Sequence, residues 1–192
     1  MKALRFIYAL LPSLFWGLII FGFEKPYAAI ITLLCALIHE CGHLLMLPEG
    51  SGIRCVLSGF RIKPGGMLSY RQRLVCYLGG PMANLATALF FLAFSMRGNE
   101  YLRDFALLSG ATGLSNLLPI EGYDGYGILL TLADMCSADR RIYSLLRVIS
   151  LFIIILLTIF SLCLMDKIGE GYWIFAVFFS GLIKSIDKSL SR

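Results

Sequence analysis

The sequence predicts an all-α membrane protein with about six transmembrane helices and a small β-hairpin insert between the second and third. Hydrophobic residues make up 58% of the 192 positions, charged residues only 15%, and the mean hydropathy is +0.81. A soluble domain of this size is closer to half apolar and a quarter charged, so the excess of apolar residues requires lipid around it. The apolar residues are also gathered in blocks of about 20, the length that crosses a bilayer core.

Six such blocks are candidate spans. The first follows Lys2 and Arg5, as a signal peptide would. It is long for a cleaved signal, however, and no small-residue cleavage site follows it, so we expect an uncut anchor. We expect residues 1–192 to form a single membrane domain with a core over 27–130 and accessory helices over 142–186. The six candidate spans are 6–23, 27–47, 74–95, 102–118, 142–165 and 171–186.

Basic residues predict the orientation of these spans. With the N-terminus in the cytoplasm, twelve Lys and Arg residues fall inside, four fall outside, and Arg147 lies within the fifth span. We therefore expect a multi-pass protein of the cell membrane with both termini in the cytoplasm. This topology and contact with anionic lipid account for the net charge of +5, so no nucleic acid partner is needed. The four outside residues are Lys25, Arg97, Arg103 and Lys167.

The connection after the second span is the longest polar stretch of the chain. Within it, Ile53–Leu57 and Phe60–Ile62 are typical of short strands separated by Ser58-Gly59. Pro64-Gly65-Gly66 predicts a turn, after which Met67–Tyr70 is a candidate third strand. We expect this hairpin on the cytoplasmic side.

The second span contains the sequence His39-Glu40-Cys41-Gly42-His43, an H-E-x-x-H motif. Residues four apart lie on one face of a helix, so both imidazoles can reach a single metal ion. Glu40 lies beside them, where it can act as the general base of a hydrolase. In a soluble helix these residues are common on solvated faces, but a carboxylate inside a membrane helix costs about 2.5–3.5 kcal/mol. The motif therefore predicts a catalytic metal site.

Two histidines need a further protein ligand, because a catalytic zinc ion usually has three and keeps a fourth position open. Asp124 is the best candidate, since it follows the cytoplasmic end of the fourth span and the histidines lie near the cytoplasmic end of the second. Taken alone, Asp124-Gly125 is typical of an ordinary turn. Glu121, three residues earlier, is the rival ligand.

Two asparagines lie close to membrane depth. Asn84 follows Gly80 by four residues and shares its helical face, where the small glycine lets another backbone approach. Asn84 could polarise a substrate carbonyl or, equally, bridge helices. Asn116 precedes Pro119, where the helix loses a hydrogen bond, and we expect it to satisfy the interrupted backbone.

Three motifs occur in order along the chain: HECGH, GGPMAN and NLLPIEGYDG. Together they resemble the site-2 protease family of intramembrane zinc metalloproteases, and most closely in style the compact bacterial branch that includes the sporulation protease of a pro-sigma factor. The resemblance covers roughly residues 30–130. It implies that His39, His43 and Asp124 hold zinc and that Glu40 is the catalytic base.

The chain departs from the family pattern near the aspartate. Family members often have prolines just before it, where this chain has Glu121-Gly122, and a further glycine is frequent where Tyr126 stands. These differences concern the shape of the loop more than the ligand itself.

The sequence therefore predicts an intramembrane zinc metalloendopeptidase. Its substrate would be a transmembrane or membrane-associated protein whose helix unwinds locally before cleavage. The expected partners are that substrate, the lipid bilayer and a possible regulatory membrane protein of unknown identity. Two other functions remain open: a membrane zinc-binding protein or transporter with the same ligands, and a catalytically silent family member.

Overall fold

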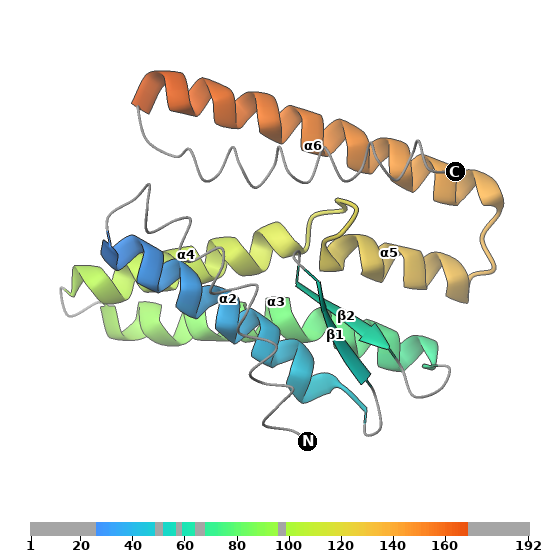
Figure 1. The fold of residues 1–192 in the computed structure, drawn as a ribbon, viewed down its shortest axis with the longest axis horizontal. Helices are drawn as coiled ribbons and strands as arrows, with labels where there is room; N and C mark the ends of the chain where they lie inside the picture. The colour runs from blue at the N-terminus through green and yellow to red at the C-terminus, as the bar shows by residue number, and fades with distance from the viewer. Residues whose placement is uncertain (1–25, 49–51, 57–58, 64–67, 96–98, 169–192) are drawn as a thin grey trace. The chain divides into compact units, whose positions relative to one another are not determined.

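A computed structural model of the chain describes residues 26–48, 52–56, 59–63, 68–95 and 99–168 (Figure 1). The spans expected at 6–23 and 171–186 lie outside these residues. The described part contains five α-helices and one two-stranded sheet. In chain order the elements are α2 (Pro26–Met46), β1 (Gly52–Val56), β2 (Gly59–Lys63), α3 (Tyr70–Ser95), α4 (Glu100–Asn116), α5 (Asp124–Met135) and α6 (Arg140–Ile168).

The described part is mainly helical, and α2, α3, α4 and α6 coincide with predicted spans. Two stretches are long and apolar enough to cross a membrane: Tyr70–Phe94 in α3 and Arg140–Cys163 in α6, with mean hydropathies of 1.5 and 2.7. Ile30–Met46 in α2 is a shorter apolar stretch. The all-α class therefore holds, and the number of six spans stays a prediction.

Helix α3 begins at a capping box that the sequence analysis overlooked. The Gln72 backbone N–H donates to Ser69 Oγ at 3.3 Å, and the Ser69 N–H donates to Gln72 Oε1 at 2.9 Å. Each side chain thus satisfies a backbone donor of the other residue at the open end of the helix. The candidate third strand over 67–70 is not present among its described residues, because Ser69 caps a helix that starts at Tyr70.

Strands β1 and β2 form an antiparallel pair between α2 and α3 in the chain. Gly52 lies opposite Lys63, and Val56 opposite Gly59. Residues 57 and 58, which connect the two strands, lie outside the described part.

Helices α2, α3 and α4 pack together in the first of two compact units (Figure 1). Small residues mark their contacts. Gly42 of α2 and Gly79 of α3 lie so close that a Cβ on either would meet the backbone carbonyl of the other. Gly113 of α4 lies against the Pro81 carbonyl and the Asn84 side chain in the same way. Glycine at such contacts lets helices approach closely without a hydrophobic driving force.

The second compact unit begins at Leu117 and contains α5 and α6. Helix α5 lies between the predicted spans 102–118 and 142–165, where the sequence analysis named no helix. Its 12 residues are too few to cross a bilayer, so a search for blocks of about 20 misses it. Gly122, with φ of 99°, adopts the left-handed conformation that glycine tolerates, and Tyr123 is extended immediately before the helix starts.

Candidate metal centre

The two histidines of α2 face each other one helical turn apart. Their Nε2 atoms are 3.2 Å apart, and the ring planes are inclined at 88° with centroids separated by 4.7 Å. His39 is buried, with 7% of its surface exposed, and His43 is half-buried. The structure thus brings together the two nitrogens that the four-residue spacing predicts.

This spacing fits a zinc ion. Nitrogen ligands lie 2.0–2.1 Å from zinc, so two of them on a tetrahedron are about 3.3 Å apart. The observed 3.2 Å between the Nε2 atoms agrees with that separation. The pair therefore needs no rearrangement of α2 to share one ion.

The ring of His43 is held by the backbone of α3. Its Nδ1 lies 2.7 Å from the Cys76 carbonyl oxygen. Because a carbonyl only accepts, Nδ1 carries the proton and Nε2 presents its lone pair. The Cys76 thiol in turn donates to the Met46 carbonyl at 3.3 Å, which fastens the end of α2 to α3. This is the ring orientation that a metal-binding histidine requires.

Gly80 of α3 makes room for both imidazoles. A Cβ at this position would lie 2.5 Å from His43 Nε2 and 2.8 Å from His39 Cε1. The sequence analysis expected a backbone to approach the Gly80 face, but the structure places the histidine rings there. The close backbone approach occurs one residue earlier, at Gly79.

Asn84 lies on the Gly80 side of α3 and is fully buried, with 0% of its surface exposed. Its Nδ2 is 3.4 Å from His39 Nδ1, and its backbone carbonyl accepts a hydrogen bond from Ser109 Oγ at 3.0 Å. Within the described residues, Asn84 Oδ1 has no hydrogen-bond partner. The predicted contact of Asn84 with a substrate stays a prediction.

Asn116 is the last residue of α4, and its side chain bonds within that helix. Its Nδ2 donates to the Thr112 carbonyl at 2.9 Å. That carbonyl also accepts from Ser115 Oγ at 3.0 Å and lies outside the last four carbonyls of α4, so the expected repair of the backbone before Pro119 stays a prediction.

Asp124 is the first residue of α5, and the loop before it is closely folded. A Cβ on Gly125 would meet the Leu117 carbonyl, so the fold of this loop requires a glycine directly after Asp124. Within the same unit, the Glu121 N–H donates to Ser150 Oγ of α6 at 2.6 Å. Burial raises the pKa of the Tyr123 phenol above its ordinary value, so this side chain stays neutral.

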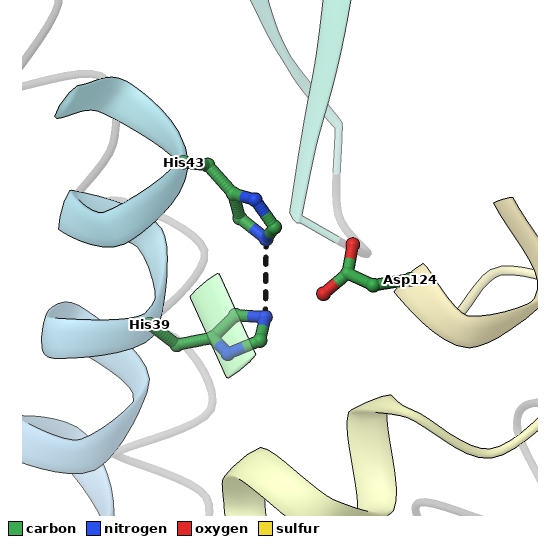
Figure 2. Close-up of side chains that lie close together, drawn as sticks. All are labelled: His39, His43 and Asp124. Atoms are coloured by element: carbon green, nitrogen blue, oxygen red, sulfur yellow. Dashed lines mark hydrogen bonds between the residues drawn. The ribbon is translucent and has the colours of Figure 1, made fainter. Parts of the chain in front are cut away.

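His39 and His43 of α2 are candidate ligands of one metal ion, and Asp124, the first residue of α5, stays the predicted third ligand (Figure 2). Each offers one ligand atom, a ring nitrogen or a carboxylate oxygen, and these are donor types that zinc accepts. Glu40, next to His39 in α2, is half-buried.

Several buried polar contacts were missed from the sequence. The span over 142–165 was judged plain apart from Arg147, yet Ser150, Thr158 and Ser161 are buried there. Polar residues in an apolar helix tend to face protein, and this signal could have identified Ser150. Nothing in the sequence points to the Cys76 carbonyl, because every residue has one.

No protein-family model matches the sequence, and no curated protein matches it. Among solved structures, the chain is similar to the site-2 protease from Methanocaldococcus jannaschii, with a TM-score of 0.65 and 17% sequence identity. The match covers 93% of this chain and 88% of that chain. At this identity the likeness shows a common fold.

Proposed function

We propose that this chain is an intramembrane zinc metalloendopeptidase of the site-2 protease family. The observation that carries the proposal is that the Nε2 atoms of His39 and His43 lie 3.2 Å apart. The ring of His43 is also fixed by its hydrogen bond to the Cys76 carbonyl of α3. The fold similarity to a site-2 protease supports it independently of the motif. The substrate would be a transmembrane or membrane-associated protein, and the enzyme a multi-pass protein with both termini and the active site toward the cytoplasm.

His39, His43 and Asp124 are the proposed zinc ligands. The histidine spacing fits the ion, and Asp124 is the carboxylate that the order of the three sequence motifs implies as the third ligand. Glu121 is the rival from the sequence, and its backbone N–H bonds to Ser150 Oγ at 2.6 Å. When bound, zinc would supply the Lewis acidity that polarises a peptide carbonyl and makes water acidic enough to react near neutral pH.

Glu40 is the proposed general base. It follows His39 in α2, so it lies beside the ligands rather than on their face. Its carboxylate would accept the proton of the attacking water and deliver it to the leaving amine of the substrate. The substrate helix has to unwind first, because its backbone is otherwise committed to internal hydrogen bonds.

Glu40→Gln tests this function. The variant keeps the size and polarity of the side chain but not its basicity, so we expect zinc content equal to wild type and loss of proteolysis by at least about 100-fold. The two forms are expressed in matched cells that lack the native copy, and the termini of all membrane-protein fragments are compared by mass spectrometry. Zinc is measured in both purified proteins.

Glu121→Gln is the matched control, because it removes a half-buried carboxylate outside the proposed ligand set. It should keep both zinc and cleavage. Fragment sets that are identical for wild type and Glu40→Gln, with zinc bound in both, would instead identify a membrane zinc-binding protein, a transporter or a silent family member.

A further inference from the structure

Helix α6 has two faces that differ in exposure. Along one of them, large apolar side chains are exposed at intervals of three and four residues, which keeps them on one side of the helix. They are Leu145, Ile149, Phe152, Leu156 and Phe160. Buried side chains follow the opposite face with the same intervals. They are Ser150, Ile154, Thr158 and Ser161. The buried face therefore packs against protein, and the exposed apolar face is the one suited to lipid.

Arg147 belongs to the protein-facing side of α6. It lies three residues before Ser150, so helical geometry places it on that face, and it is half-buried. Tyr143 lies one turn earlier on the same face and donates to Asp134 of α5 at 2.8 Å. Ser150 accepts from the Glu121 N–H, just before α5, at 2.6 Å. Arg147 thus lies between two contacts that join α6 to the segment around α5.

The guanidinium of Arg147 differs from the other polar groups on this face, because the described residues supply no partner for it. The hydroxyls of Thr158 and Ser161 are bonded to carbonyls of α6 at 2.7 and 2.8 Å, and those of Tyr143 and Ser150 are bonded as above. No described carboxylate forms an ion pair with Arg147. A charged side chain inside an apolar span is costly without a counter-ion and marks a binding site by default. The site therefore requires an anion from another molecule.

The anion that fits this position is a carboxylate carried by a protein. A guanidinium binds carboxylates and phosphates through paired N–H groups, and the phosphates of a membrane belong to lipid headgroups. Lipid surrounds the exposed apolar face of α6, whereas Arg147 lies on the protein-facing side. A transmembrane segment that packs beside α5 and α6 would bring a carboxylate to that side.

Arg147 is also connected to the proposed zinc ligand Asp124. Ser150, one turn further along α6, bonds to the backbone three residues before Asp124. In the predicted orientation α6 begins in the cytoplasm, so Arg147 lies on the cytoplasmic side of this contact. We propose that Arg147 is a specificity-determining residue that binds an aspartate or glutamate of the substrate, on the cytoplasmic side of the bond that is cut. This inference rests on the proposed function and names its substrate class, transmembrane segments with an acidic residue near their cytoplasmic end.

Two synthetic transmembrane peptides test this binding without any cleavage. Each is a Leu/Ala helix of about 20 residues, long enough to span a bilayer, with either Asp or Asn in the second turn from one end. Binding to purified Glu40→Gln protein is measured by energy transfer between fluorescent labels in phosphatidylcholine vesicles. We expect the Asp peptide to bind about 10–100-fold more tightly, as hydrogen bonds to a charged group allow. Adding Arg147→Gln to the same protein should remove this preference.

Arg141→Gln is the matched control, since Arg141 is exposed and lies about 120° around the helix from Arg147. It removes the same charge and should keep the preference for Asp. Arg147→Lys keeps the charge and should retain a preference of at least a few-fold. Equal binding of the two peptides in the presence of Arg147 would overturn the proposal. So would an Arg147→Gln protein that keeps the preference and shows faster amide exchange over residues 120–123, because Arg147 would then support the loop.

A lipid ligand would give a different result. Vesicles that contain phosphatidylglycerol would show this lipid enriched around the protein in an Arg147-dependent way, with no preference between the peptides, and the proposal would fail.

The comparison of membrane-protein fragments separates this inference from the proposed function. Arg147→Gln should lose cuts beside acidic residues by at least about tenfold and keep the other cuts, with zinc content unchanged. A uniform loss of all cuts would contradict a role in specificity. If even the wild type makes no cuts, the proposed function fails, and the peptide preference alone decides the role of Arg147.

Discussion

Gly80 contributes to the proposed centre by having no side chain. Both imidazoles occupy the space beside its Cα, and a methyl group there would lie 2.5 Å from the Nε2 of His43. That nitrogen is a proposed zinc ligand, so the smallest possible substitution reaches the metal position directly.

We therefore predict that Gly80→Ala weakens zinc binding by at least about tenfold, because crowding displaces the rings, and destabilises the protein by about 1–3 kcal/mol. Chelator competition and thermal unfolding measure the two effects. Gly110→Ala is the control: the added Cβ would lie 3.4 Å from the Ala88 Cβ, an ordinary contact, and should change neither. Wild-type zinc affinity in Gly80→Ala would contradict the role of Gly80.

The contacts of His39 differ in how far the sequence predicts them. The four-residue spacing of His39 and His43 is enough to predict that their nitrogens converge, since helical geometry alone decides it. The contact of Asn84 with His39 depends on how α2 crosses α3. A shift of α3 by one residue would put Gly79 or Pro81 where Gly80 lies, and local sequence does not specify the crossing.

At the scale of elements, α6 anchors the loop that leads to Asp124. Ser150 is 1% exposed, and its hydroxyl accepts the Glu121 N–H in a segment that has no helix or strand. A second bond joins α6 to α5, the helix that follows this loop, because Tyr143 in α6 donates to Asp134 in α5 at 2.8 Å. The helix counted as accessory from the sequence is thus a structural part of the Asp124 segment.

Ser150→Ala should release this loop. The substitution leaves the Glu121 N–H without its acceptor, which costs about 1–3 kcal/mol when the group stays buried. We expect faster amide hydrogen exchange over residues 120–123 and a several-fold weaker zinc affinity, both measured on purified protein.

Ser161→Ala provides the comparison for this prediction. Ser161 is equally buried in α6, but its hydroxyl donates to the Thr158 carbonyl of its own helix at 2.8 Å. Its loss should leave the loop unaffected. Similar exchange rates over 120–123 in the two variants would contradict an anchoring role for Ser150.

Element boundaries were predicted well where apolar blocks have bilayer length, as in α2 and α6. Helix α5 was missed because its 12 residues form no such block, and the onset of α3 because Ser69 and Gln72 were not considered as a capping pair. The short helix α5 and the Ser69–Gln72 capping pair are both local features that the sequence contains and that could have been recognised in it. The bond from Ser150 to the loop is different, since it joins positions 29 residues apart.

At the scale of the whole molecule, the boundary between the two compact units falls after Asn116. Asp124 therefore shares a unit with α6, whereas the histidines belong to the unit of α2, α3 and α4. Sequence motifs in the correct order predicted the ligand set, but they do not contain this division, which depends on which helices pack together.

The predicted orientation can be tested with a native thiol. Cys136 is exposed just after α5, in the connection expected in the cytoplasm. A membrane-impermeant maleimide should label it in inside-out vesicles and leave it unlabelled in right-side-out vesicles, with the site located by mass spectrometry. The Cys136→Ser variant measures the background labelling of the other cysteines. Cys163, exposed on the apolar helix α6, should stay unlabelled in both kinds of vesicle. Labelling from the outside would reverse the topology.

The close contact of Gly42 with Gly79 has a mechanical consequence. Gly42 lies next to His43 in α2. Pro26, the first residue of α2, lies sixteen residues before Gly42, which is about 24 Å along the helix axis. A tilt of α2 by about 10° around this fulcrum would move its far end by about 4 Å but His43 by only about 0.3 Å, given the rise of a helix. In such a tilt the far ends of α2 and α3 would separate, the Tyr27–Tyr101 ring contact would break, and His43 would stay nearly in place.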